Sequence, residues 1–244
     1  MEGLSRRNQN VQDIMVRIEP FEIFPDRYEE WFEVNRFVYE SELQAVKQLL
    51  PKSGNSIEVG VGSGRFAAPL SIELGIEPSA EMRKIAISKG IKVIDGVAES
   101  LPFDDAQFDF VLMVTTVCFL DDIEAAFKET FRVLKPQGYF IIGFIDKESP
   151  MGQFYQEHKD ENPFYKIADF YSVNEVARHL KLASFDCFHF TQTVFHNLSE
   201  IKEVQPVKEW YGEGSFVVIR AKKKHDVIKK AFKQNNGRLY SRSI

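Results

Sequence analysis

Cysteine is scarce in this chain of 244 residues, and long apolar runs are absent. Cys118 and Cys187 are its two thiols, too few for the disulfide framework of a small secreted domain. No run approaches the ~20 apolar residues that a membrane-spanning helix requires, and the first ten residues are polar. With 44% hydrophobic residues, the chain can bury a full core without disulfides or metals. We therefore expect a soluble cytoplasmic protein.

Histidine is also uncommon, and its spacing suggests no metal site. His189 and His196 are seven residues apart on or near a predicted strand, so their side chains tend to face opposite sides. His158 and His179 stand alone in the sequence. We expect no bound metal.

Positive charge is scarce outside the C-terminus. The net charge is −5, but the last 24 residues carry eight basic residues and one acid, which leaves 23 basic and 35 acidic residues in the other 220. An acidic body does not suit nucleic acid, whose binding depends on basic surface. Residues 222–244 form a basic tail, which is either a solvated appendage or an arm for RNA or a membrane. We favour the appendage, because charged termini usually bury little.

Strand-like and helix-like patterns alternate along the chain, with no repeat or linker to divide it. Strands are expected near residues 56–60, 72–76, 91–95, 108–114, 139–145, 187–194 and 215–220. This alternation predicts an α/β fold, a doubly wound parallel sheet with helices on both faces. Residues 1–221 then form a single domain that begins with lid helices over about 20–50.

Two of the predicted helices have clear boundary signals. Asp121, with Glu124 three residues later, predicts the start of one helix, and Pro136 with Gly138 predicts its end. Residues 172–175 form a second capping box, Ser-Val-Asn-Glu, before another helix.

The most informative motif is an acid followed by three alternating glycines. Residues 57–64 read IEVGVGSG, with Glu58 before Gly60, Gly62 and Gly64. Glycines let the backbone turn sharply and approach a ligand that a Cβ would exclude. Nicotinamide-binding turns are spaced G-x-G-x-x-G, whereas the third glycine here comes one residue early. Glu58 would repel a pyrophosphate and attract an α-ammonium, directly or by ordering the turn, so the motif favours S-adenosylmethionine over NAD.

A second acid follows the next apolar run. Residues 74–76 end at Glu77, where a carboxylate can accept both hydroxyls of a ribose. The two acids and the glycine turn together predict an adenosine site.

These blocks resemble the class I S-adenosylmethionine-dependent methyltransferases. Residues 58–64 match the family's acid-x-G-x-G-x-G turn, and the matches to its other motifs follow in order at 77–82, 96–103, 108–111 and 131–139. The resemblance covers roughly residues 25–220. It implies a Rossmann-like sheet of seven strands, mostly parallel with an antiparallel last strand, and S-adenosylmethionine as cofactor.

The resemblance also implies where the cofactor lies. The expected contacts come from Tyr28, Glu58, Gly60, Gly62, Gly64, Arg65, Glu77, Pro78, Ser79, Met82, Val97, Ala98, Glu99, Thr115 and Thr116. Adenine would lie against Pro78 and Val97, and the sulfonium beside residues 115–116. Arg65 or Tyr28 would reach the carboxylate of the methionine end.

One feature departs from the family pattern. Only six residues, 65–70, lie between the last glycine and Ser71, so the helix after the glycine turn should be barely two turns long. A longer helix would cover that face of the sheet.

Residues 114–119 lack the motifs of two classes of methylase, which reduces the range of possible methyl acceptors. Methylases of exocyclic amino groups carry an [Asn/Asp]-Pro-Pro-aromatic turn there, and cytosine-C5 methylases use a Pro-Cys nucleophile, but this stretch has no proline and Cys118 follows Val117. We predict in-line methyl transfer to a small-molecule acceptor, with no catalytic base assigned. An RNA or protein methyltransferase, or a non-catalytic S-adenosylmethionine-binding protein, are the alternatives.

Aromatic residues indicate where that acceptor would bind. Ligands of such sheets lie beyond the carboxyl ends of the parallel strands. We expect the helix that carries Tyr28 and two later stretches, 146–171 and 196–214, to meet there. Tyr211 belongs to the second of these stretches.

Overall fold

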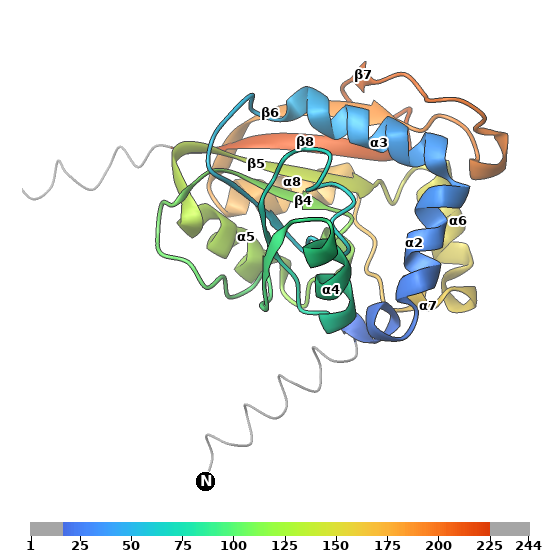
Figure 1. Ribbon diagram of the computed structural model, residues 1–244. Helices are drawn as coiled ribbons and strands as arrows, with labels where there is room; N and C mark the ends of the chain where they lie inside the picture. Colours follow the sequence, from blue (N-terminus) through green and yellow to red (C-terminus); the bar gives the residue numbers. More distant parts are fainter. Residues whose placement is uncertain (1–16, 225–244) are drawn as a thin grey trace, which may run out of the picture.

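Five parallel strands form the first half of the sheet in the computed structural model, which describes residues 17–224 (Figure 1). The strand order is β3-β2-β1-β4-β5-β8-β6-β7. The bounds are β1 Ser56–Val59, β2 Leu74–Ile76, β3 Lys92–Ile94, β4 Phe108–Val114, β5 Leu134–Ile145, β6 Phe185–Thr193, β7 Lys208–Glu209 and β8 Phe216–Lys223. The last strand, β8, runs antiparallel between β5 and β6. The Rossmann-like fold with an antiparallel last strand is therefore confirmed.

The predicted count of seven strands was one too low for the described residues. The extra strand, β7, contains two residues and pairs with Thr191 and Gln192 of β6. Its two residues, Lys208 and Glu209, are charged and exposed, so no apolar alternation marks them in the sequence.

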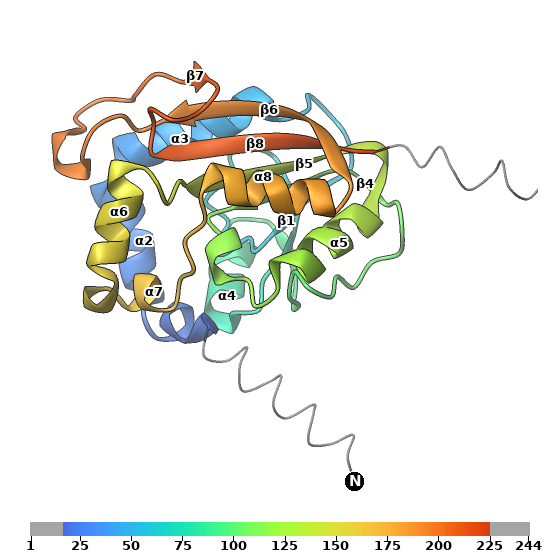
Figure 2. The same ribbon diagram turned by 180° about the vertical axis from the view of Figure 1, so that it is seen from behind.

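Helices cover both faces of the sheet (Figures 1 and 2). Val111 and Met113 of β4 pack in one core with α5 (Ile123–Val133) and α8 (Val173–Leu182). Leu112, between them, faces a second core with Val46 of α3 (Arg36–Leu49). Successive strand residues point to opposite faces, so β4 anchors both layers.

Helix boundaries agree with the sequence signals in one case and differ in the other. The capping box of α8 is present, with the Ser172 side chain accepting from the Glu175 N–H. The cap of α5 is Asp122, not Asp121, and its carboxylate accepts from the N–H groups of residues 124 and 125. Pro136 and Gly138 do not end α5: the helix stops at Val133, and both residues lie inside β5 at its irregular start.

The short helix expected after the glycine turn is absent. Residues 61–71 form a series of turns, in which the Ala68 N–H donates to the Gly64 carbonyl, and the series ends at Ser71 with φ of 58°. That face is covered instead from α3, because the Tyr39 ring packs edge-on against Phe66 with centroids 5.7 Å apart. The Tyr39 hydroxyl also donates to the Arg65 carbonyl at 2.5 Å.

The N-terminal helices and the start of the tail bear on the domain boundaries. Residues 17–23 are helical and precede α2 (Pro25–Val34) and α3. Lys222 and Lys223, the first residues of the expected tail, belong to β8 and pair with β5 and β6. The Lys224 N–H donates to the Ser184 carbonyl, and residues 225–244 of the tail lie outside the described residues. Within 17–224, no helix is long and apolar enough to cross a membrane.

Candidate functional site

The glycine turn after β1 adopts backbone angles that favour glycine, and at Gly60 it also lies too close to Thr116 for a larger residue. Gly60 has φ of +70°, and a Cβ there would lie 2.3 Å from the Thr116 Cγ2. Gly62, with φ of +53°, has the Tyr28 hydroxyl 3.4 Å from its Cβ position. L-residues with side chains rarely adopt such backbone angles. The turn therefore needs glycine at both positions, and it forms one wall of a cavity that we term the glycine pocket.

Glu77, directly after β2, forms the polar floor of the glycine pocket. Its Oε2 accepts from the Gly62 N–H at 2.8 Å and its Oε1 from the Ser79 N–H at 2.9 Å. The residue is 7% exposed, and burial raises the pKa of its carboxyl to about 7 despite these two donors. Each oxygen keeps a lone pair, so the carboxylate can accept two further hydroxyl groups from a ligand.

Other loops at the same edge of the sheet complete the glycine pocket. The expected residues that line it are Tyr28, Gly60, Gly62, Glu77, Pro78, Val97, Ala98, Glu99, Thr115 and Thr116. The Glu99 Oε1 accepts from the N–H groups of Asp121 and Asp122, so this side chain also fixes the entry to α5. The Thr116 hydroxyl lies 3.2 Å from the Gly60 carbonyl and 3.0 Å from that of Val114, which ties β4 to the glycine turn.

The structure places Arg65 away from the glycine pocket. Its guanidinium pairs with Glu29 at 2.8 Å and Glu33 at 3.0 Å, and lies over the Phe32 ring. All three partners belong to α2, which the sequence does not reveal as a neighbour of the turn. Arg65 thus docks α2 onto the turn and does not face a ligand.

Four further expected residues lie behind the pocket wall. A Cβ on Gly64 would lie 2.4 Å from the Ile91 Cδ1, so this glycine permits close packing. Ser79 caps α4 (Ala80–Ser88), its hydroxyl accepting from the N–H of Met82, whose side chain is fully buried. Glu58 is 1% exposed, its Oε2 has no partner, and burial raises the pKa of its carboxyl well above the usual range.

Sequence reasoning missed the helix 17–23. Arg17, Ile18 and Phe21 line the glycine pocket, and Arg17 donates to the Leu120 carbonyl at 2.9 Å. The same guanidinium pairs with Asp121 at 2.7 Å and Asp169 at 3.1 Å. Ile18 and Phe21, three residues apart, are the signal that could have extended the lid helices to this segment.

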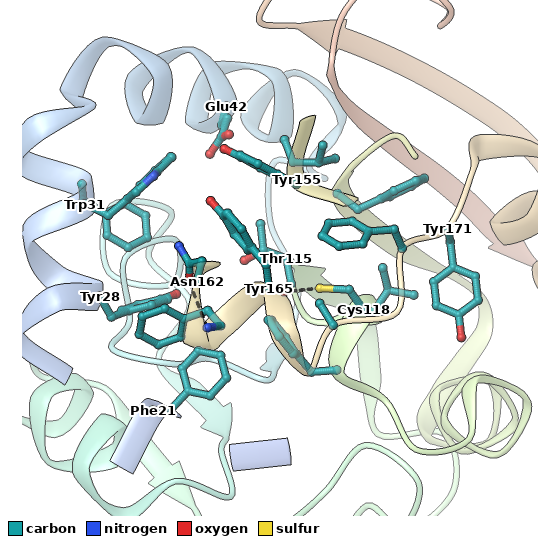
Figure 3. Close-up of a pocket in the computed structure, with 18 of the residues that line it drawn as sticks. Phe21, Tyr28, Trp31, Glu42, Thr115, Cys118, Tyr155, Asn162, Tyr165 and Tyr171 are labelled. Carbon is teal, nitrogen blue, oxygen red and sulfur yellow. Dashed lines mark hydrogen bonds between the residues drawn. The ribbon is translucent and has the colours of Figure 1, made fainter. Parts of the chain in front are cut away.

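A second cavity, the aromatic pocket, is shown in Figure 3. It adjoins the glycine pocket. Its rings come from Phe21, Tyr28, Trp31, Phe32, Phe66, Phe119, Phe144, Tyr155, Phe164, Tyr165, Phe170 and Tyr171. Tyr155 of α6 (Pro150–Glu157) stacks on Tyr165 of α7 (Pro163–Lys166), with ring centroids 4.2 Å apart. Phe21, Tyr28, Thr115 and Phe119 line both cavities. The two cavities therefore meet at these residues.

Of the two later stretches expected at this pocket, the first contributes and the second does not. Residues 146–171 supply Tyr155 and Tyr165. Tyr211 instead packs on Phe190, with centroids 4.9 Å apart, and its hydroxyl donates to Asn174. The chain after β6 returns along that strand as β7, which keeps 196–214 away from the pocket.

Few polar groups interrupt the aromatic pocket. Cys118 lines it, with its thiol donating to the Thr115 carbonyl at 3.4 Å, and burial raises the pKa of this thiol to about 12. A thiol held neutral is a poor nucleophile. Burial also raises the pKa of the Tyr28 hydroxyl, which stays protonated and can donate. Between residues 17 and 224, no three His, Cys, Asp or Glu side chains lie close enough to hold a metal ion.

Comparison with known proteins identifies the family. A family model for a methyltransferase domain matches residues 57–142. A solved structure from Thermotoga maritima, described as a SAM-dependent methyltransferase and possible histamine N-methyltransferase, is 52% identical with a TM-score of 0.83. The match covers 85% of this chain and 100% of the other. This chain belongs to the S-adenosylmethionine-dependent methyltransferases.

Two further relatives are similar to this chain. An uncharacterised protein of Methanocaldococcus jannaschii is 44% identical to this methyltransferase over 203 residues, 83% of this chain and 98% of its own. A demethylmenaquinone methyltransferase of Chlorobaculum tepidum is 34% identical over 130 residues, 50% of this chain. The match spans 53% of that protein's length.

S-adenosylmethionine is the cofactor of this methyltransferase, and the chemistry of the glycine pocket suits it. Glu77 offers paired acceptors, as a ribose diol requires, and Gly60 and Gly62 line the pocket with backbone that carries no side chain. When bound, S-adenosylmethionine supplies a methyl group carried on a sulfonium.

Proposed function

We propose that this chain transfers a methyl group from S-adenosylmethionine in the glycine pocket to a small-molecule acceptor in the aromatic pocket. The observation that carries the proposal is the junction of the two cavities at Phe21, Tyr28, Thr115 and Phe119. In-line displacement requires donor and acceptor to approach along one line, and adjoining cavities with shared walls allow this.

The donor is held by residues from several strand ends. Glu77 accepts the ribose hydroxyls, Pro78 and Val97 pack against adenine, and the Ala98–Glu99 segment contacts its edge. The protonated Tyr28 hydroxyl, beside Gly62, donates to the methionine end. Thr115 and Thr116, directly after β4, lie beside the sulfonium.

A small acceptor agrees with the size and lining of the aromatic pocket. Its cavity volume is about 170 Å³, and an apolar cavity of ~150 Å³ accommodates a molecule of the size of benzene. Both the Thermotoga maritima and the Chlorobaculum tepidum relatives are described in terms of small-molecule methylation. RNA or protein acceptors would depend on the basic residues of the tail, most of which lie outside the described part of the chain.

The chemistry asks the chain for positioning and for exclusion of water. Holding two reactants in line can contribute roughly 7–11 kcal/mol without an acid or base. The rings of the aromatic pocket exclude water, and those at the shared wall can face a sulfonium through cation–π contact. We assign no general base.

An acceptor screen with isotope-labelled S-adenosylmethionine tests this proposal. The full chain is incubated in turn with metabolite, RNA and protein fractions, and the labelled product is identified by mass. We expect label in a metabolite. Label confined to RNA or protein, or binding of the donor with no transfer to any fraction, would contradict the small-molecule reading.

A further inference from the structure

Glu42 is a carboxylate in a position that otherwise holds core residues. The buried face of α3 carries Val38, Ala45, Val46 and Leu49, and Glu42 lies on that same face with 3% exposure. Acids are almost never fully buried without a partner, because desolvation of the charge is costly. Its burial therefore requires an explanation.

The Glu42 carboxylate points into the aromatic pocket, beside the Tyr155 hydroxyl (Figure 3). Within residues 17–224 it forms no ion pair, and burial alone raises the pKa of its carboxyl to about 8. The basic side chain that lines this pocket, Arg27, is exposed to solvent. The described chain thus leaves a buried acid without a cation, facing an open cavity.

The other groups around Glu42 favour a positive charge. Tyr155 and Tyr165 from α6 and α7, and Trp31 from α2, present rings to the same cavity (Figure 3). Aromatic faces attract cations, and a desolvated contact of this kind is stronger than an exposed one. The hydroxyls of both tyrosines have a pKa raised mainly by burial, so they carry no competing charge.

We propose that Glu42 binds a cationic nitrogen of the methyl acceptor, in the part of the aromatic pocket that is not shared with the glycine pocket. This inference rests on the proposed function and names the substrate class. Glu42 lines the aromatic pocket but not the glycine pocket, whereas Phe21 lines both. The two residues lie at opposite ends of the view in Figure 3. The acceptor is therefore an amine with an aromatic or apolar body.

The placement of Glu42 also constrains which atom is methylated. A protonated nitrogen has no lone pair with which to attack a sulfonium. A cation held by Glu42 is therefore distinct from the reacting atom, which lies toward Phe21, Tyr28, Thr115 and Phe119. The acceptor carries two functional groups, a cationic anchor and a nucleophile at its other end.

Calorimetry with two simple probes tests the inference. Titrations of 2-phenylethylamine and 2-phenylethanol, which share a ring and differ in charge, are made into the full chain saturated with S-adenosylhomocysteine. The pH is held near 8, where the Glu42 carboxyl ionises. We expect the amine to bind at least tenfold more tightly than the alcohol, and Glu42→Gln to reduce that preference below threefold while alcohol binding is unchanged.

Matched variants separate charge from structure. Glu40→Gln removes an acid from the same helix that pairs with Arg36 at the surface, and it should keep the preference for the amine. Glu42→Asp keeps the charge on a shorter side chain and should retain part of the preference for the amine. An amine that binds no better than the alcohol to the wild type, or a preference that survives Glu42→Gln, would overturn the inference.

Failure of this inference and failure of the proposed function give different results. S-adenosylhomocysteine affinity is measured first in the same experiment. If it binds and neither probe does, the anchor at Glu42 is wrong and the cofactor pocket stands. If it does not bind to the wild-type chain, both proposals are overturned.

Discussion

The Glu77 carboxylate accepts a hydrogen bond from the backbone N–H of Gly62 at 2.8 Å. This contact joins the end of β2 to the glycine turn after β1, so the acid and the turn are held together beyond the ends of these two strands. The Ser79 N–H holds the second oxygen, at the start of α4. Much of the proposed cofactor site depends on this one side chain.

Substitution of Glu77 by Ala should weaken S-adenosylhomocysteine binding by roughly 1.5–3 kcal/mol, about 10- to 150-fold, as for loss of hydrogen bonds to a charged acceptor. Calorimetry measures this directly. Glu73→Ala, an exposed acid just before β2, is the matched control and should bind normally. Equal affinity in the Glu77→Ala variant and the wild type would refute the ribose role.

Substitutions at two glycines with positive φ distinguish the effect of a steric clash from the effect of backbone strain. A Cβ on Gly60 would lie 2.3 Å from Thr116, whereas Gly90, with φ of +88°, has nothing within 4 Å. Gly90→Ala should cost about 1–2 kcal/mol of unfolding free energy through strain alone. Gly60→Ala should cost more and should lower S-adenosylhomocysteine affinity at least tenfold. Chemical denaturation and calorimetry compare the two variants, and equal effects would contradict the role of the Gly60 turn.

Arg17 should hold the cofactor in place through the helix 17–23. Its side chain is 28% exposed and pairs both with Asp121, which lines the glycine pocket, and with Asp169. Partly exposed pairs are worth about 0.2–1 kcal/mol each, so Arg17→Gln should speed S-adenosylhomocysteine release severalfold. Stopped-flow dissociation measures the release rate. Arg36→Gln, which breaks a surface pair within α3, should leave the release rate unchanged. An unchanged release rate in Arg17→Gln would contradict the role of Arg17 in holding the cofactor.

The buried acids should make stability depend on pH. Burial raises the folded-state pKa of Glu42 from 4.5 to about 8. An acid of this kind costs stability as pH rises, because the unfolded state ionises first, by about 1.4 kcal/mol per pH unit between the two pKa values. Glu42→Gln should therefore have little effect on unfolding free energy near pH 4.5 and should stabilise the ligand-free chain increasingly up to about pH 8. Urea denaturation of the wild type and the variant across this pH range measures the effect. A difference in unfolding free energy that does not change with pH would contradict the burial of a titrating acid.

The sequence predicted those features whose signal is local. Strand β4 was placed at 108–114 as observed, because its apolar run is bounded by turn residues. The glycine turn was recognised because a tight turn requires glycine at fixed spacing. Glu77 was recognised as the acid that directly follows the next apolar run. Residues 97–99 and 115–116 were expected at the cofactor from the resemblance to the family, and they line the glycine pocket.

Features set by tertiary contacts escaped the sequence. Arg65 follows the glycines, but the acids of α2 determine where its guanidinium points. Tyr211 was assigned to the pocket, but the course of β7 carries it elsewhere. Glu42 reads as a polar residue on an amphipathic helix, and its burial becomes visible only when α6 and α7 close the aromatic pocket.

The central claim is that the methyl acceptor binds in the aromatic pocket. The rate of methyl transfer by the Tyr165→Ala variant tests it most directly, with Tyr211→Ala as the control. Tyr165 lines the aromatic pocket and Tyr211 does not. With labelled S-adenosylmethionine and the metabolite found by the acceptor screen, Tyr165→Ala should lose at least tenfold in transfer rate while S-adenosylhomocysteine affinity changes by less than tenfold, roughly 1.4 kcal/mol. Tyr211→Ala should transfer normally. Normal transfer by Tyr165→Ala would show that the acceptor does not bind in the aromatic pocket.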